Sequence, residues 1–185
     1  MQPTHHSRRL ALLMAPLLAA ATSPFQPVMS TDIVSGLPFD GPSTVQFLSQ
    51  TSLFDAPKIK NLNDTTWDWW YFDVVSSDMQ YSAVIVFWTT TPDGLQPGLP
   101  SPGSADYMTL GVTLPDGTAL NAEVVAPELT VFTVDNGSSG ILNGTLSGWT
   151  STPDMSHYSI IIDAPEFDTF GTISFESVRS SRLGA

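Results

Sequence analysis

The chain has 185 residues, a formal net charge of −12 and no cysteine. This length suits a single domain, because a chain of this size closes one hydrophobic core and rarely two. Only 6 basic side chains stand against 18 acidic ones, which argues against nucleic acids, acidic membranes and phosphorylated substrates as partners. The lack of cysteine excludes disulfides, cysteine-based metal sites and a thiol nucleophile.

The N-terminus has the pattern of a secretory signal. A basic start with Arg8 and Arg9 precedes an apolar run from Leu10 to Ala21. This run is too short to span a bilayer as a helix, and the small residues at its end provide an A-x-A cleavage pattern. We therefore expect a signal peptide over residues 1–21 and a protein of the secretory pathway; a retained N-terminal anchor is the alternative.

Three glycosylation sequons agree with secretion, although about one is expected by chance in a chain rich in Ser and Thr. They begin at Asn63, Asn136 and Asn143, and we expect glycans there.

The body of the chain reads as strands separated by turns, with no amphipathic helix longer than about three turns. Residues 22–62 are rich in Pro, Ser and Thr and are expected to form an extended arm, followed by a β-domain over 63–178 and a tail over 179–185. A long loop, 92–103, is a candidate pocket rim. The fold class is therefore all-β and antiparallel, a barrel or a sandwich. Strands are expected at 67–76, 81–91, 107–114, 119–125, 129–134, 141–149, 157–164 and 171–178, with turns at 115–117, 135–137 and 152–154.

Most familiar catalytic machinery is missing. His157 is the only histidine after the predicted signal, so we expect no metal. No G-x-S-x-G motif presents a serine beside it, and a single histidine at the start of a strand is more often a surface or packing residue. No G-x-G-x-x-G or P-loop motif is present, and we expect no cofactor.

The strongest local signal is a cluster of aromatic residues. Trp67, Trp69, Trp70, Tyr71 and Phe72 fall within six positions. Strand alternation places Trp69 and Tyr71 on one face, and Trp70 and Phe72 on the other. Two interpretations remain open from these residues alone: burial on both sides, or an apolar ligand pocket on one side.

The aromatic cluster belongs to a recognisable motif. The string WDWWYFDVVSSD, followed by the apolar strand YSAVIVFW, closely resembles the W-x-x-WYFD signature of the fungal Diels–Alderase family. That family groups with carotenoid hydratases of the hydroxyneurosporene synthase type as two-domain, lipocalin-like proteins. The segments DGPSTVQFLS and GTISFESV are also similar, so the resemblance covers residues 40–178. It implies an antiparallel lipocalin-like β-barrel or half-barrel.

The resemblance implies a pericyclase that catalyses a [4+2] cycloaddition on an apolar polyketide-derived intermediate, in a pathway of the cytochalasan or tropolone-terpenoid kind. Such a step needs a held substrate conformer and hydrogen-bond donors, and no cofactor. From the position of the motif we expect Tyr71 and Trp69 to be catalytic, as donor and pocket wall. The expected substrate-binding residues are Trp67, Trp70, Phe72 and Trp88.

One departure from the family concerns length, because the family chain is about twice as long and binds its substrate between two domains. A partner domain or chain is therefore expected to meet this one, through Trp88, Trp149 or Tyr158, and the tail at 179–185 suggests a truncation point. Two alternatives stay open: a non-catalytic secreted lipocalin-like binder or inactive fragment, and a carbohydrate-binding β-sandwich.

Overall fold

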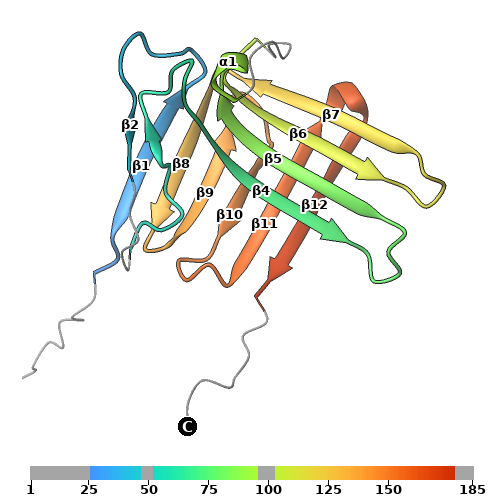
Figure 1. Ribbon diagram of the computed structural model, residues 1–185. Coiled ribbons are helices and arrows are strands. Elements are labelled where there is room, and N and C mark those ends of the chain that lie inside the picture. The colour runs from blue at the N-terminus through green and yellow to red at the C-terminus, as the bar shows by residue number, and fades with distance from the viewer. Residues whose placement is uncertain (1–25, 47–51, 96–102, 178–185) are drawn as a thin grey trace, which may run out of the picture.

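The computed structural model describes residues 26–46, 52–95 and 103–177. The predicted signal peptide, the tail at 179–185 and parts of the predicted arm and loop lie outside the described residues. Two large antiparallel sheets, one of six strands and one of four, lie face to face (Figure 1). The hydrophobic core lies between them, and β2 (Thr44–Val45) and β3 (Ile59–Lys60) form a third sheet of two short strands.

The four-stranded sheet is built from consecutive hairpins, in the order in which its strands follow along the chain. Its strands are β4 (Trp67–Val75), β5 (Ser82–Thr90), β6 (Asp106–Thr113) and β7 (Ala119–Ala126).

The six-stranded sheet takes its first strand from the N-terminal segment and the other five from the C-terminal half, so β1 lies at one edge and β12 at the other. Its strands, in spatial order, are β1 (Met29–Ser35), β8 (Glu128–Val134), β9 (Gly137–Leu142), β10 (Gly148–Ser151), β11 (His157–Ala164) and β12 (Thr169–Glu176).

The remaining described elements are short, and the prediction that no helix exceeds about three turns is confirmed for the described residues. None of the helices in these parts of the chain is long and apolar enough to cross a membrane. The elements are β2 (Thr44–Val45), β3 (Ile59–Lys60), α1 (Pro92–Leu95) and a 3₁₀ turn η1 (Pro165–Phe167).

The all-β antiparallel prediction is confirmed, and the two sheets are separate rather than joined in one closed barrel. The predicted strand at 141–149 is wrong, because this segment holds the end of β9, a turn and the start of β10. The turn contains Gly144 at φ +87°, a conformation that glycine adopts without steric cost.

The predicted N-terminal arm also contributes to the core sheet. Residues 29–35 pair along their whole length with β8, from Met29 opposite Val134 to Ser35 opposite Glu128. The segment is extended, as expected, but strand β1 is an integral part of the six-stranded sheet.

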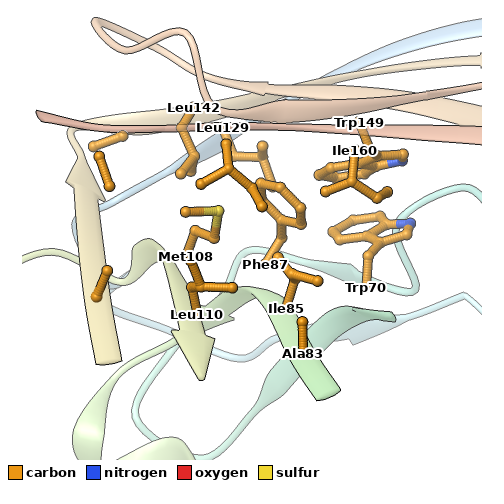
Figure 2. Close-up of a cluster of buried hydrophobic side chains, with 14 of the residues drawn as sticks. Trp70, Ala83, Ile85, Phe87, Met108, Leu110, Leu129, Leu142, Trp149 and Ile160 are labelled. Carbon is orange, nitrogen blue, oxygen red and sulfur yellow. The ribbon is translucent and has the colours of Figure 1, made fainter. Parts of the chain in front are cut away.

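The core lies between the inward faces of the two sheets (Figure 2). Trp149 from β10 is its largest fully buried side chain, and its ring packs 4.6 Å from Trp70 and 4.8 Å from Phe87, centroid to centroid. The expectation that Trp149 lies on a domain-facing surface is therefore wrong. Gly140 on the neighbouring strand makes room for the indole, because a Cβ added there would lie 2.2 Å from the ring.

Candidate functional site

Strand β4 carries five of the six predicted site residues and is an edge strand of its sheet, whereas Trp88 lies on the neighbouring strand β5. The alternation expected from the sequence is observed. Trp67 and Trp69 are each 40% exposed and Tyr71 is 52% exposed on the outer face, whereas Trp70 is 6% exposed and faces the core. Phe72 lies on the same inner face, packed against the core.

The outward aromatic side chains continue across the sheet. Register places Trp69 opposite Trp88 and Trp88 opposite Tyr107, and cross-strand neighbours on one face make contact. Ring centroids lie 4.4 Å apart for Trp67–Trp69, 5.2 Å for Trp69–Trp88 and 6.2 Å for Trp88–Tyr107. We call Trp67, Trp69, Tyr71, Trp88 and Tyr107 the aromatic face.

The structure therefore brings four of the predicted residues together, namely Trp67, Trp69, Tyr71 and Trp88. The other two, Trp70 and Phe72, lie on the opposite side of the sheet. The Trp70 indole donates a hydrogen bond to the Asp55 carbonyl oxygen at 3.3 Å, so this residue fixes the loop that precedes β4 as well as filling the core.

The two faces of β4 meet at its free edge, where a cleft of about 530 Å³ opens between the sheets. Phe72 on β4 packs against Tyr158 on β11 and Phe175 on β12, with ring centroids 5.7 and 5.9 Å apart. We call this the edge cleft; its lining residues are Asp55, Trp69, Trp70, Tyr71, Phe72, Asp73, Tyr158 and Phe175.

A loop at residues 52–58 forms one end of the edge cleft. The Asp55 backbone N–H donates to the Asn136 carbonyl oxygen at 3.0 Å, and the Lys58 N–H donates to Asp68 Oδ2 at 2.6 Å. Burial raises the pKa of the Asp68 carboxyl above its usual range, although hydrogen bonds from Lys58 and Trp69 oppose this effect. Asp68 thereby ties the loop to β4.

A larger hollow, of about 670 Å³, lies elsewhere, between β1, the segment 37–40 that follows it, and strand β3. The long Lys60–Asp32 ion pair, at 3.9 Å, lies there. None of the predicted site residues lines it, and its walls carry less aromatic surface than the edge cleft. We therefore regard the aromatic face and the edge cleft as the candidate site.

At two of the three predicted glycosylation sites, the asparagine side chain makes hydrogen bonds within the fold. The Asn63 side-chain amide donates to the Gly41 carbonyl oxygen at 2.8 Å, and that of Asn143 donates to Glu128 Oε1 at 2.6 Å. Asn136 is half-buried. A glycan replaces one of the two hydrogens of the side-chain amide, so the Asn63 bond can persist after glycosylation. The Asn143 amide also donates to Thr130 Oγ1 at 3.0 Å, so glycosylation there requires one of its two bonds to break. Glycosylation of these sites stays a prediction.

His157 lies exposed at the start of β11. Within the described ranges, no group of three or more His, Asp or Glu side chains is placed to hold a metal ion.

Sequence reasoning missed the residues that complete the edge cleft. Asp55 sits in a loop with no recognisable motif and is separated from Tyr158 by 103 positions. Tyr158 was expected at a domain-facing surface rather than in a cleft, and Phe175 was not singled out. No local pattern reveals that these three side chains meet, because the meeting depends on how the two sheets pack.

Comparison with known proteins places this geometry in a family. A family model described as Diels-Alderase-like matches residues 34–185. The chain is 32% identical over 148 residues to the quinolone epoxide rearrangement protein asqO of Emericella nidulans, and 29% identical over 148 residues to the quinolone epoxide rearrangement protein penF of Penicillium thymicola. These matches cover 78% and 76% of this chain and 40% of each relative.

Solved structures of similar fold include CghA with Sch210972, with a TM-score of 0.62 and 18% sequence identity, and CghA alone, with a TM-score of 0.61. Each match covers 80% of this chain and 39% of the solved chain. At this identity the likeness establishes the fold alone. The chain thus spans about two fifths of the length of the proteins that it matches.

Proposed function

The chain belongs to the Diels-Alderase-like family, and we propose that it supplies the substrate-binding aromatic face of a fungal secondary-metabolite enzyme that closes a ring by [4+2] cycloaddition. The substrate would be an apolar, polyketide-derived intermediate. The observation that carries the proposal is the aromatic face itself: Trp67, Trp69 and Tyr71 are 40–52% exposed, although the sheet beneath them has a complete core on its other side.

The proposed reaction suits a surface of this kind. In an intramolecular [4+2] cycloaddition, two carbon–carbon σ bonds form at the expense of two π bonds, and no atom or electron leaves the substrate. The protein has to hold diene and dienophile in register, and such positioning lowers the barrier by reducing the entropy lost on reaching the transition state. Aromatic side chains on a hydrogen-bonded β-sheet are large and rigid, and they therefore suit this purpose.

Hydrogen-bond donors beside the rings would polarise the dienophile. Tyr71 belongs to the aromatic face and also lines the edge cleft. Trp69 lies next to it on the same face. A donor placed on a carbonyl that gains negative charge in the transition state contributes about 10²–10³ in rate. We assign this role to Tyr71 first and to the Trp69 indole second.

A second reaction is favoured by the relatives described above, whose names specify rearrangement of a quinolone epoxide. A rearrangement, like an intramolecular cycloaddition, converts a compound into its isomer. The same surface is compatible with either reaction, because both depend on restricting the conformations of a bound substrate.

The proposal includes a second domain or chain that covers the aromatic face. Support comes from the solved and curated proteins, of which this chain matches 39–40%, and from the exposure of the aromatic rings. With the face covered, water would be excluded from the reacting atoms.

The test is deletion of the gene in the fungus that carries it, followed by comparison of metabolites. We expect a ring-containing product to disappear and an isomer of equal mass to accumulate. Purified protein, alone and joined to the remaining part of a relative, should convert that isomer into the product faster than buffer does. Nuclear magnetic resonance of the product distinguishes a cyclohexene from a rearranged epoxide. Retention of the isomer without conversion by either protein would contradict catalysis and favour a passive binder.

A further inference from the structure

A third hollow, of about 510 Å³, lies over strands β5, β6 and β7, and the proposed function gives it no role. Most of its lining residues alternate along their strands with core positions, so they share the outer face of the sheet with Trp88 and Tyr107. We call it the Gly111 hollow; its outward-facing lining residues are Val84, Thr109, Gly111, Asn121 and Glu123.

Gly111 lies at the centre of this hollow, and packing does not explain why a glycine stands there. Register places it between Val84 on β5 and Asn121 on β7. Among the described residues, a Cβ added to Gly111 would meet only Asn121 Oδ1, at an ordinary contact distance of 3.5 Å, and its φ is not in the left-handed region. A glycine inside a strand packs no side chain and often marks a place where a ligand approaches the backbone.

Thr109 joins the Gly111 hollow to the aromatic face. The Trp88 indole N–H donates a hydrogen bond to Thr109 Oγ1 at 2.9 Å. In this bond the Thr109 oxygen is the acceptor, and within the described parts of the chain its own hydroxyl proton is donated to no other group. Thr109 is half-buried, so a ligand in the hollow can reach this proton. Accepting one hydrogen bond also makes a hydroxyl a stronger donor.

The groups around the hollow suit a neutral carbonyl. The Thr109 hydroxyl and the Asn121 side-chain amide are both donors that a carbonyl oxygen can accept from. The Glu123 carboxylate lines the same hollow, and no lysine or arginine occurs between Lys60 and Arg179, so the sheet provides no cation for a carboxylate or a phosphate. The chemistry therefore favours a ketone, ester or amide over an anionic group.

We propose that the Gly111 hollow is a subsite of the aromatic face that takes a neutral carbonyl group of the ligand, with the Thr109 hydroxyl donating a hydrogen bond to the carbonyl oxygen. Thr109 is then a binding residue that determines specificity. Trp88 is a positioning residue, because its N–H holds the Thr109 oxygen in place. The inference rests on the proposed function, since it adds a second contact to the same substrate surface.

Two compounds of the same shape test this by nuclear magnetic resonance titration of the purified chain: 2-acetylnaphthalene and 2-isopropenylnaphthalene, in which a methylene group replaces the carbonyl oxygen. The quantity compared is the dissociation constant of the isopropenyl compound divided by that of the acetyl compound. Thr109→Val keeps the shape of the side chain and should lower this ratio about fivefold, the value of one hydrogen bond. Thr109→Ser retains the hydroxyl and should retain the wild-type ratio.

The ratio isolates the carbonyl bond, because a movement of Trp88 in Thr109→Val affects both compounds alike. Thr113→Val makes the same chemical change on the same strand and face but outside the hollow, and should leave the ratio unchanged. A third compound, 2-naphthoate, should bind the wild-type chain more weakly than 2-acetylnaphthalene, because its carboxylate meets Glu123.

A pair of glycine variants locates the subsite even if Thr109→Val folds poorly. Gly111→Val fills the hollow and should weaken both neutral compounds without lowering the melting temperature, since valine suits a strand. Gly171→Val adds the same side chain on β12, at a glycine whose surroundings are also open, and should leave both affinities unchanged.

Failure of the wild-type chain to bind 2-acetylnaphthalene, an unchanged ratio in Thr109→Val, or a lowered ratio in Thr109→Ser would each overturn the inference. Normal binding by Gly111→Val, or naphthoate bound as tightly as the ketone, would do the same. These outcomes are separate from those of the proposed function. Carbonyl-selective binding by a protein that converts no substrate refutes the proposed function alone, whereas turnover by a protein whose Thr109→Val variant keeps the wild-type ratio refutes this inference alone.

Discussion

Asp106 is a buried acidic residue whose burial destabilises the folded state. Its side chain is fully buried at the start of β6, and among the described residues neither carboxyl oxygen has a hydrogen-bond partner. Burial raises the pKa of Asp106 to about 8; the nearby Leu129 backbone N–H opposes this and the Glu128 charge adds to it. A buried carboxyl without partners is held in its neutral form.

The consequence is a stability that falls as pH rises. In the unfolded chain Asp106 ionises near the ordinary aspartate pKa of 3.8, but in the folded chain only near 8. The folded state therefore binds more protons between these values, and the free energy of unfolding decreases with pH until about 8. The full penalty is on the order of a few kcal/mol.

Asp106→Asn tests this assignment. Asparagine has nearly the same shape and does not titrate, so the variant should lose less stability than wild type between pH 5 and pH 8.5, each an approximate limit set by the two pKa values. Urea unfolding at both pH values measures the difference. Parallel pH dependence in the two proteins would show that Asp106 is ionised or solvated in the folded state.

For single residues, the sequence predicted the face of a strand on which a side chain lies better than it predicted which residues the side chain contacts. Two-residue alternation was enough to separate Trp69 and Tyr71 from Trp70 and Phe72, because a strand leaves no other choice. The same logic cannot pair Asp55 with Tyr158, which come from a loop and from the opposite sheet.

Among the elements, strands β9 and β10 show how closely the core sheet is packed. Gly140 faces the Trp149 ring, and its Cα carries no side chain that would displace the indole. On the outer face of β6, Gly111 has a nearest neighbour at 3.5 Å from an added Cβ, which is ordinary contact. The two glycines therefore form a matched pair in the middle of strands.

Gly140→Ala should lower the free energy of unfolding by about 1–3 kcal/mol, because the methyl group must push the indole or the strand aside. Gly111→Ala should be neutral or stabilise by up to about 1 kcal/mol, since alanine reduces the entropy of the unfolded chain. Denaturant unfolding of both variants measures this. Similar losses in both would mean that strand glycines matter for backbone reasons rather than for the fit of Trp149.

Element boundaries were predictable where hydrophobic alternation and a turn signal agreed. The β6–β7 hairpin follows its prediction, with Gly117 at φ +83° and the Leu114 N–H bonded to the Thr118 carbonyl oxygen. The prediction of a single strand over 141–149 was wrong because apolar residues at both ends of the segment resemble one continuous strand. The turn at Asn143–Gly144 lies between them.

For the whole molecule, the face-to-face packing of the two sheets creates both parts of the candidate site. The core holds the two sheets together (Figures 1 and 2). Strand β4, at the edge of its sheet, carries the edge cleft, and the outer side of the same sheet carries the aromatic face. The sequence predicted the all-β class and the aromatic strand, but strand β1 as part of the six-stranded sheet depends on long-range pairing that local patterns do not encode.

The central claim is that the aromatic face is the substrate surface, and the rate and stereoselectivity of conversion in Trp69→Ala test it most directly. The control is Phe132→Ala, which removes an aromatic ring of similar exposure from β8 in the other sheet. With the isomer that accumulates in the deletion strain as substrate, we predict that Trp69→Ala is slower than wild type by at least about tenfold and gives a mixture of stereoisomers, because unproductive conformers then bind. Phe132→Ala should match wild type. Equal rates and selectivity for wild type and Trp69→Ala would contradict the assignment of the site to this face.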